Sequence, residues 1–216
     1  MFPQQPQQQF RTAGADVQIF YGSGGTVAQN QRTWMKPAGV SHIYMMLIGG
    51  GANGDGAVQG GGSGAVTVWY GSAQHVPDSL VVSPSRGSGN NTTVSARFSN
   101  STAAPTALLT ANASTGTSGA TAMTANQFTA SGFFQSVAGM AGNSGGGSAT
   151  TFLCGGDSAS STTGNYGYVT ALNGIFQLQP IIVSVGGVQD GRGGLGSGGG
   201  YLSGVGGPGM VLIASW

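Results

Sequence analysis

Charged residues are scarce in this chain of 216 residues: they make up 5% of it, whereas soluble domains average about 25%. Lys36 is the only lysine, all acidic residues are aspartates, and glutamate is absent. This supply is too poor for general acid–base chemistry, so we expect neither an enzyme nor a cofactor. The formal net charge of +1 argues against nucleic acid or a membrane surface as a partner. Because few groups titrate, folding stability should depend weakly on pH.

Cysteine and long apolar runs are also lacking. Cys154 is alone, so no disulfide can form within the chain. No stretch approaches the roughly 18 consecutive apolar residues that predict a transmembrane helix. Residues 1–10 read MFPQQPQQQF and have neither the basic n-region nor the apolar h-region of a secretory signal. We therefore expect assembly in the cytoplasm of a host cell. The Pro/Gln composition predicts an extended arm over residues 1–12, with Phe2 and Phe10 as candidate anchors, before a domain at 13–216.

Glycine and strand-forming residues are abundant. There are 43 glycines, and hydrophobic residues reach 39%, enough to form a core. Short segments rich in β-branched and aromatic residues recur between glycines, whereas helix formers are rare. The expected strands are 16–21, 31–35, 40–48, 65–70, 79–83, 92–98, 106–111, 132–138, 151–154, 175–185 (bent at Pro180) and 210–216. We predict an all-β fold: an antiparallel, jelly-roll-like β-sandwich with long ordered glycine-rich loops.

Two glycine-dense blocks, 49–64 and 186–209, stand directly between expected strands. They could be flexible linkers, but linkers usually mix glycine with serine and charge and do not lead straight into buried strands. Glycine lacks a Cβ, so extended backbones can pack side by side, and a polyproline-II-like conformation is one way to do so. We favour ordered glycine, held by the sandwich and by neighbouring subunits, because fixing glycine costs much conformational entropy.

The order of these features is distinctive. The domain begins with Thr33-Trp34-x-x-Pro37-Ala38-Gly39-Val40, an apolar strand and Gly49-Gly50-Gly51, and it closes with Gly206-Gly207-Pro208-Gly209 before an apolar strand and Trp216. Over about residues 32–216 the chain resembles the glycine-rich domain of bacteriophage tail-fibre and virion surface proteins, a family also found in uncultured phages. The resemblance implies a structural role in a virion and often a trimer.

Motifs for other functions are weak. Gly49-x-Gly51-x-x-Gly54 matches a dinucleotide fingerprint, but a strand and not a helix is expected next. Cys154 has no motif that pairs it with His42 or His75, and these three residues do not cluster as a zinc site. We expect His42 to be a hydrogen-bonded sheet residue and His75 to be exposed. Asp55 and Asp190 look like turn residues. We therefore predict no catalytic, cofactor or metal site.

These features favour a homo-oligomeric, trimeric surface component of a bacteriophage virion, either a capsid decoration protein or a short tail fibre. Its expected partners are copies of itself and capsid or tail proteins. One alternative is the receptor-binding tip of a fibre, which would hold a host surface glycan through glycine-loop backbone groups and through Tyr166 and Tyr168 in an expected loop. Another alternative is a glycine-rich protein of a bacterial cell surface or filament.

Overall fold

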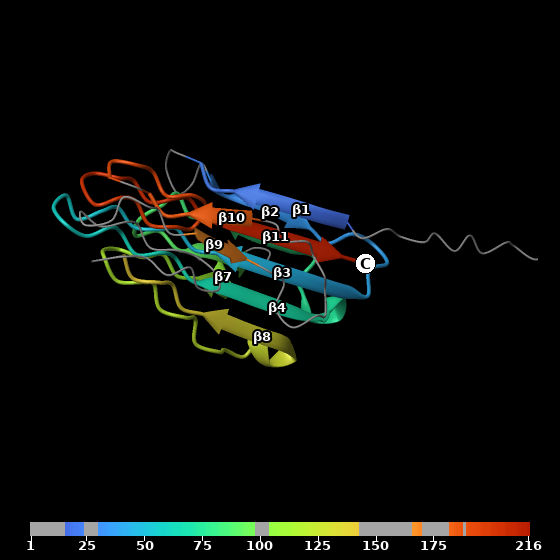
Figure 1. Ribbon diagram of the computed structural model, residues 1–216. Coiled ribbons are helices and arrows are strands. Elements are labelled where there is room, and N and C mark those ends of the chain that lie inside the picture. The colour runs from blue at the N-terminus through green and yellow to red at the C-terminus, as the bar shows by residue number, and fades with distance from the viewer. Residues whose placement is uncertain (1–15, 24–29, 98–103, 143–165, 170–181, 188) are drawn as a thin grey trace, which may run out of the picture.

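The computed structural model describes residues 16–23, 30–97, 104–142, 166–169, 182–187 and 189–216. These residues form the predicted all-β structure (Figure 1). The elements are β1 (Asp16–Tyr21), β2 (Arg32–Met35), β3 (His42–Ile48), β4 (Val66–Ser72), the 3₁₀ turn η1 (Ala73–His75), β5 (Ser79–Ser83), β6 (Thr92–Ala96), β7 (Thr106–Ala111), the 3₁₀ turn η2 (Thr129–Ser131), β8 (Gly132–Val137), β9 (Tyr166–Val169), β10 (Ile182–Val185) and β11 (Met210–Ser215).

The strands form two main antiparallel sheets. One has five strands in the order β1-β11-β3-β4-β8, and the other has four in the order β2-β5-β6-β7. Strands β9 and β10 pair with each other in a small separate sheet. The C-terminal strand β11 lies between β1 and β3, and all of its residues are buried, as its apolar sequence predicts.

The main core lies between the two large sheets. Every second residue of β3 points into it, namely Ile43, Met45 and Leu47, and Trp69 of β4 lies in the same cluster. The four-stranded sheet contributes its own inward residues, which are Trp34, Leu80, Val82, Val94, Leu109 and Ala111. Because side chains alternate between the faces of a strand, this packing confirms the antiparallel sandwich.

The five-stranded sheet is apolar on its other face as well. Tyr44, Met46 and Ile48 of β3 are buried there. Neighbouring strands add Val66, Val68, Met210, Leu212 and Ala214. We call these eight residues the second apolar cluster, and Leu195 from residues 186–209 packs against it. Residues on both faces of β3 are therefore buried. The same face continues onto the edge strand β1.

The Pro37-Ala38-Gly39 turn leads from β2 to β3. Gly39 has a φ of +81°, in the left-handed region that favours glycine. Just before the turn, the Nζ of Lys36 donates hydrogen bonds to the carbonyls of Val76 (2.8 Å) and Ala73 (3.2 Å) and lies 2.8 Å from Oδ1 of Asp78. The only lysine of the chain thus joins β2 to the segment between β4 and β5.

The glycine-rich segments are joined by backbone hydrogen bonds into one network at one end of the sandwich (Figure 1, left). We call this the glycine network; it comprises residues 49–65, 112–121, 138–142 and 189–209. Bonds between its first and last segments run from Gly51 N–H to Gly207 O (2.9 Å), Gly61 to Gly199 (2.8 Å) and Gly64 to Gly196 (2.8 Å). Others reach the middle segments, from Gly62 to Gly116 (2.8 Å), Ser63 to Met140 (2.8 Å) and Gly139 to Ala120 (2.8 Å).

Glycine is required in this network because the backbones approach one another closely. A Cβ added to Gly51 would overlap the carbonyl of Ser197, and one added to Gly62 would overlap that of Ser118, in each case inside the 3.0 Å that real Cβ atoms respect. This close approach lets backbone N–H and C=O groups of the network form hydrogen bonds with one another, where those of an open loop would bind water. Whether its segments adopt a polyproline-II-like conformation stays a prediction.

Tyr44 is an exception to the expected weak pH dependence. Burial raises its pKa from 10.0 to about 12, because the ionised phenolate would lose hydration. The folded protein therefore holds this proton more tightly than the unfolded chain, and the resulting stability is lost as pH rises from 10 towards 12. We expect this group to lower the unfolding free energy by about 3 kcal/mol over that interval. Urea unfolding of the wild type and of Tyr44→Phe at several pH values between 10 and 12 measures this loss. If the unfolding free energy fell equally with pH in both proteins, the assignment to Tyr44 would be contradicted.

Candidate functional site

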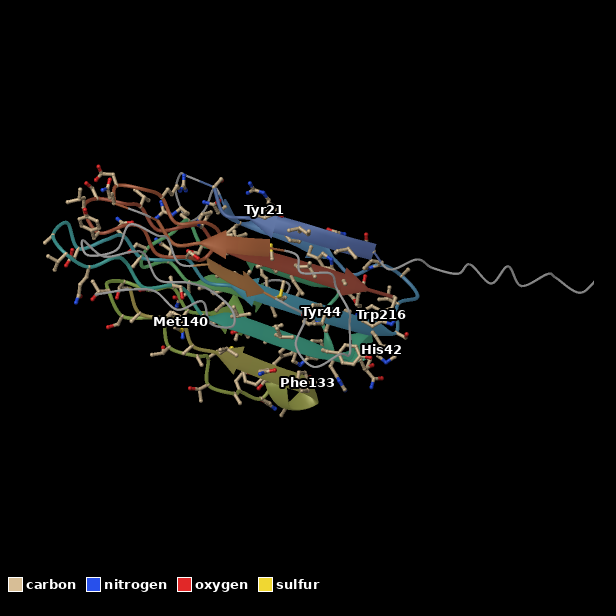
Figure 2. All side chains as sticks on the ribbon, in the orientation of Figure 1. Tyr21, His42, Tyr44, Phe133, Met140 and Trp216 are labelled. Atoms are coloured by element: carbon tan, nitrogen blue, oxygen red, sulfur yellow. The ribbon has the colours of Figure 1, made fainter. Side chains whose placement is uncertain are left out.

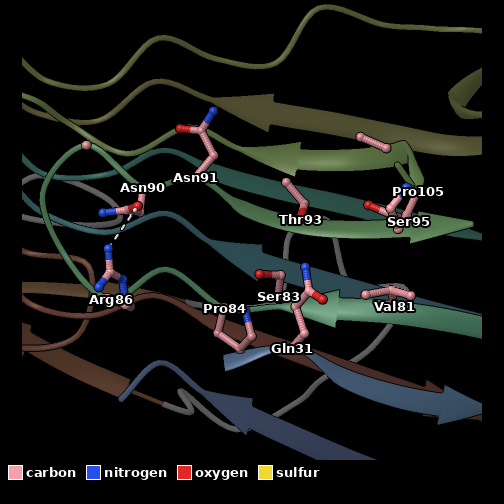
Figure 3. A pocket seen from close by; sticks show the side chains of 12 residues that line it. Gln31, Val81, Ser83, Pro84, Arg86, Asn90, Asn91, Thr93, Ser95 and Pro105 are labelled. Atoms are coloured by element: carbon pink, nitrogen blue, oxygen red, sulfur yellow. Dashed lines mark hydrogen bonds between the residues drawn. The ribbon is translucent and has the colours of Figure 1, made fainter. Parts of the chain in front are cut away.

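A polar groove lies on the outer face of the four-stranded sheet (Figure 3). Its floor comes from alternating positions: Leu80 and Val82 of β5 point into the core, so Val81 and Ser83 point outward. In β6, Val94 points inward, and its neighbours Thr93 and Ser95 complete the floor. The cavity has a volume of about 350 Å³ and is lined by Gln31, Val81, Ser83, Pro84, Arg86, Gly89, Asn90, Asn91, Thr93, Ser95, Pro105 and Ala107.

The floor of the groove carries a cluster of hydroxyl groups. Ser83 and Thr93 are directly opposite each other on β5 and β6. Ser95 is paired with Val81 on the same two strands, next to a register shift at Val94/Ser95 where β6 meets β7. Such irregularities locally re-aim side chains. Among the described residues, the hydroxyls of Ser83, Thr93 and Ser95 make no hydrogen bond with another protein group. They are available to a bound molecule.

The loop between β5 and β6 forms the rim at the glycine-rich end. The Oδ1 of Asn91 accepts the backbone N–H of Ala113 (2.8 Å), which fixes the amide. The Nη2 of Arg86 lies 3.4 Å from Oδ1 of Asn90 (Figure 3, dashed line), and the Nδ2 of Asn90 donates to the carbonyl of Ser88 (3.0 Å). Arg86 is the only ionisable side chain among the residues that line the groove.

The composition of the lining limits its chemistry. Hydroxyls, amides and one guanidinium can donate and accept hydrogen bonds, but the lining offers no carboxylate, histidine or cysteine. The described lining residues therefore include no pair of the kind used in acid–base or nucleophilic catalysis. The arrangement suits binding of a polar molecule.

Three aromatic rings lie close together on the five-stranded sheet, at the end that is far from the glycine network. The ring centroids of His42, Tyr70 and Trp216 are 5.7, 6.0 and 5.9 Å apart, and their planes differ by 8° to 18°. Nearly equal separations exclude a single face-to-face column, so the rings form a parallel, offset cluster. Figure 2 shows His42, Tyr44 and Trp216 on this sheet. All three rings of the cluster are half-buried, and Tyr70 and Trp216 pack against the second apolar cluster.

The structure revises the predicted location of Tyr166 and Tyr168, the two candidate receptor contacts. Tyr166 and Tyr168 do not lie in a loop: they belong to strand β9, opposite Val185 and Val183 of β10. The alternation Tyr-Gly-Tyr-Val is compatible with a strand, and pairing with β10 fixes it there. The side chains of β9 are outside the description, and so are Phe2 and Phe10 of the expected arm and Cys154. The proposed contacts and anchors remain predictions.

The histidines and aspartates mostly lie as the sequence predicts. His42 is in β3, with its Nδ1 3.0 Å from the Ser41 hydroxyl, and His75 is exposed in η1. The backbone N–H groups of Ala57, Val58 and Gln59 donate hydrogen bonds to Oδ1 of Asp55 (2.8 to 3.0 Å). These bonds lower the pKa of Asp55, and the bond from Ala57 has the largest effect. Asp190 is also in a turn, but among the described residues its Oδ1 accepts a hydrogen bond from the side-chain hydroxyl of Ser203 (3.3 Å) and not from backbone N–H groups.

Sequence reasoning did not single out the groove. Its signal was present in the alternation of SLVVS and TTVSA, which places serine and threonine on the outer face. The concave shape, however, depends on the loop carrying Arg86 and Asn90 and on Pro105 before β7, and no local pattern reports how these segments meet.

Comparisons with known proteins add no assignment: no family model matches the chain, and no curated protein matches it. Within the described ranges, no helix has the length and apolar character needed to span a membrane. The same part of the chain contains no group of three or more His, Cys, Asp or Glu residues placed to hold a metal ion.

Proposed function

We propose that this protein is a structural component of a bacteriophage virion surface and that it assembles as a homo-oligomer, with a trimer as the expected state. The observation that carries the proposal is the glycine network. A set of loops locked by backbone hydrogen bonds forms a rigid end to the sandwich. This end has few charged side chains, which suits a passive outer part of a particle.

The surface chemistry supports a role in changing surroundings. Six lysine and arginine residues and five acidic residues in 216 leave few sites for trypsin-like cleavage and few groups that titrate. Stability that hardly varies between mildly acidic and neutral pH follows from this composition. A particle outside its host benefits from both properties.

Exposed apolar residues support self-association. Val17, Ile19 and Tyr21 on the edge strand β1 are 46%, 41% and 57% exposed. Their partners in β11 belong to the second apolar cluster, so they extend that apolar face to the sheet edge. Phe133 extends it at the other edge, on β8. Contact with another copy would remove these groups from water and protect the edge strand.

Two measurements test this function. Native mass spectrometry of the purified chain should give three times the 21.3 kDa chain mass, and Ile19→Lys should shift the protein to the monomer because it places a charge on the apolar edge. Quantitative mass spectrometry of purified phage particles that encode the protein should find it. Hundreds of copies per particle would indicate capsid decoration, and few copies would indicate a fibre. A monomeric wild type that is absent from particles would contradict the proposal.

A second candidate function is attachment of the particle to a host surface glycan. The polar groove favours it, because hydroxyls and amides in a concave surface can form hydrogen bonds with sugar hydroxyl groups. The glycine-loop backbone and the tyrosines of β9 remain the other predicted contacts for this function.

A further inference from the structure

We propose that the polar groove on the four-stranded sheet binds a carboxylated sugar, one or two rings of a glycan that contains a uronic or sialic acid, with Arg86 beside the carboxylate. The inference rests on the attachment function proposed above. It adds to those predicted contacts a defined site on β5, β6 and the loop between them.

The hydroxyl groups of the floor are the first argument. Ser83, Thr93 and Ser95 are held in strands, so their positions are fixed before binding, and Ser83 and Ser95 are only 8% and 6% exposed. Each hydroxyl can donate one hydrogen bond and accept others. A sugar presents adjacent hydroxyls with the same dual capacity, so it can satisfy several of these groups at once.

The apolar residues of the lining are the second argument. Val81 is on the floor, and Pro84 and Pro105 lie at opposite ends of it (Figure 3). A sugar ring has C–H groups as well as hydroxyls, and it needs apolar contact as well as hydrogen bonds. The cavity volume of about 350 Å³ lies in the range of small-ligand pockets, about 300–1,000 Å³.

The charge of the lining gives the preference for an acid. Arg86 contributes the only ionisable group, and its guanidinium can donate two parallel hydrogen bonds to a carboxylate. The contact of its Nη2 with the neutral amide oxygen of Asn90 is long, at 3.4 Å, compared with about 2.7–2.9 Å for a charge-assisted bond. A ligand carboxylate within reach of the guanidinium would therefore form a stronger bond than this contact with Asn90, which is one of the contacts that Arg86 makes within the protein.

The same lining disfavours other polar ligands. Single-stranded nucleic acid requires aromatic side chains for base stacking and several cations for the backbone, whereas the lining residues that the structure describes include one cation and no aromatic residue. A divalent cation requires carboxylate oxygens, which are also missing from the lining. A small carboxylated, hydroxyl-rich molecule fits the groups that are present.

The test uses the purified full chain labelled with ¹⁵N. Methyl glucuronide and sialyllactose are titrated and compared with their neutral counterparts, methyl glucoside and lactose, and binding is followed by NMR shifts of backbone amides. We expect shifts at Arg86, Asn91 and Thr93 and about tenfold tighter binding of the acidic sugars, a preference that salt weakens.

Three variants separate the contributions. Arg86→Gln should abolish the preference for the acid and retain binding of the neutral sugar, whereas Thr93→Val, which has nearly the same shape, should weaken both about fivefold. Arg97→Gln is the control, because it removes the same charge from an exposed residue just after β6 that does not line the groove, and it should bind like the wild type.

Equal affinity for acidic and neutral sugars, shifts located elsewhere, or no binding at millimolar concentration would overturn the inference. An effect of Arg97→Gln equal to that of Arg86→Gln would overturn it too, since the charge would then act from a distance. Failure here while the protein is found in particles would remove the sugar site and leave the virion role intact. Sugar binding by a protein that is absent from particles would support the sugar site and contradict the virion role.

Discussion

Replacing Gly51 by alanine is expected to prevent the glycine network from forming and to lower the unfolding free energy by more than about 4 kcal/mol, an exceptional loss for one substitution. The new Cβ would overlap the backbone carbonyl of Ser197, which cannot move away as a flexible side chain could. Moving that carbonyl would disturb the neighbouring bonds from Gly207 N–H to Ser197 O (2.8 Å) and from Gly51 N–H to Gly207 O (2.9 Å). Chemical denaturation, or soluble yield if the variant does not fold, measures the effect.

Gly116→Ala is the matched control for this experiment. Gly116 lies in the same network and its carbonyl accepts the N–H of Gly62, but an added Cβ would meet no atom within 4 Å. We expect this variant to be as stable as the wild type or more stable by up to about 1 kcal/mol, because alanine restricts the unfolded chain. Equal stability of Gly51→Ala and Gly116→Ala would show that the segments are not closely packed.

The second large effect is expected at Trp69, where alanine should lower the unfolding free energy by about 3–5 kcal/mol. This side chain is fully buried between the two sheets, and its ring lies 4.8 Å from that of Phe128. Gly71 and Gly132 leave room for it, because a Cβ at either position would meet the indole ring within 3.0 Å. The substitution therefore opens a cavity whose backbone walls cannot close.

Two further variants sharpen the Trp69 experiment. Trp69→Phe should cost clearly less than alanine, because it keeps a ring and removes an indole N–H that is buried without a hydrogen-bond partner in the described part of the protein. Met35→Ala in β2 should have almost no effect, because Met35 is 62% exposed. A loss below about 1 kcal/mol for Trp69→Ala would contradict the assignment of this residue to the core.

Much of the sandwich was predictable from local pattern. The strands at Ser79–Ser83 and Thr106–Ala111 have the predicted bounds, because turn residues or a change in composition mark their ends. The strand Val66–Ser72 runs past its predicted end at Tyr70, since pairing with β3 and β8 carries Gly71. Tertiary pairing there overrides the low strand propensity of glycine.

The less predictable parts depend on contacts between distant segments. Tyr166–Val169 is a strand only because β10 lies beside it, and glycine next to Tyr166 made the segment resemble a loop. Composition indicated ordered glycine, but not that Gly61 would bond to Gly199, far along the chain. The groove likewise combines Gln31, Arg86 and Pro105 from three connections. The expected strands at 151–154 and in residues 175–181 lie outside the described residues.

Amide hydrogen exchange of ¹⁵N-glycine-labelled protein tests most directly whether the glycine segments are held in fixed positions. We predict that the N–H groups of Gly51, Gly61, Gly62 and Gly64, which donate backbone bonds of 2.8 to 2.9 Å, exchange as slowly as amides in the central strands β3 and β11. Exchange of these glycines at the rates of an unstructured peptide, while the strands stay protected, would contradict the account.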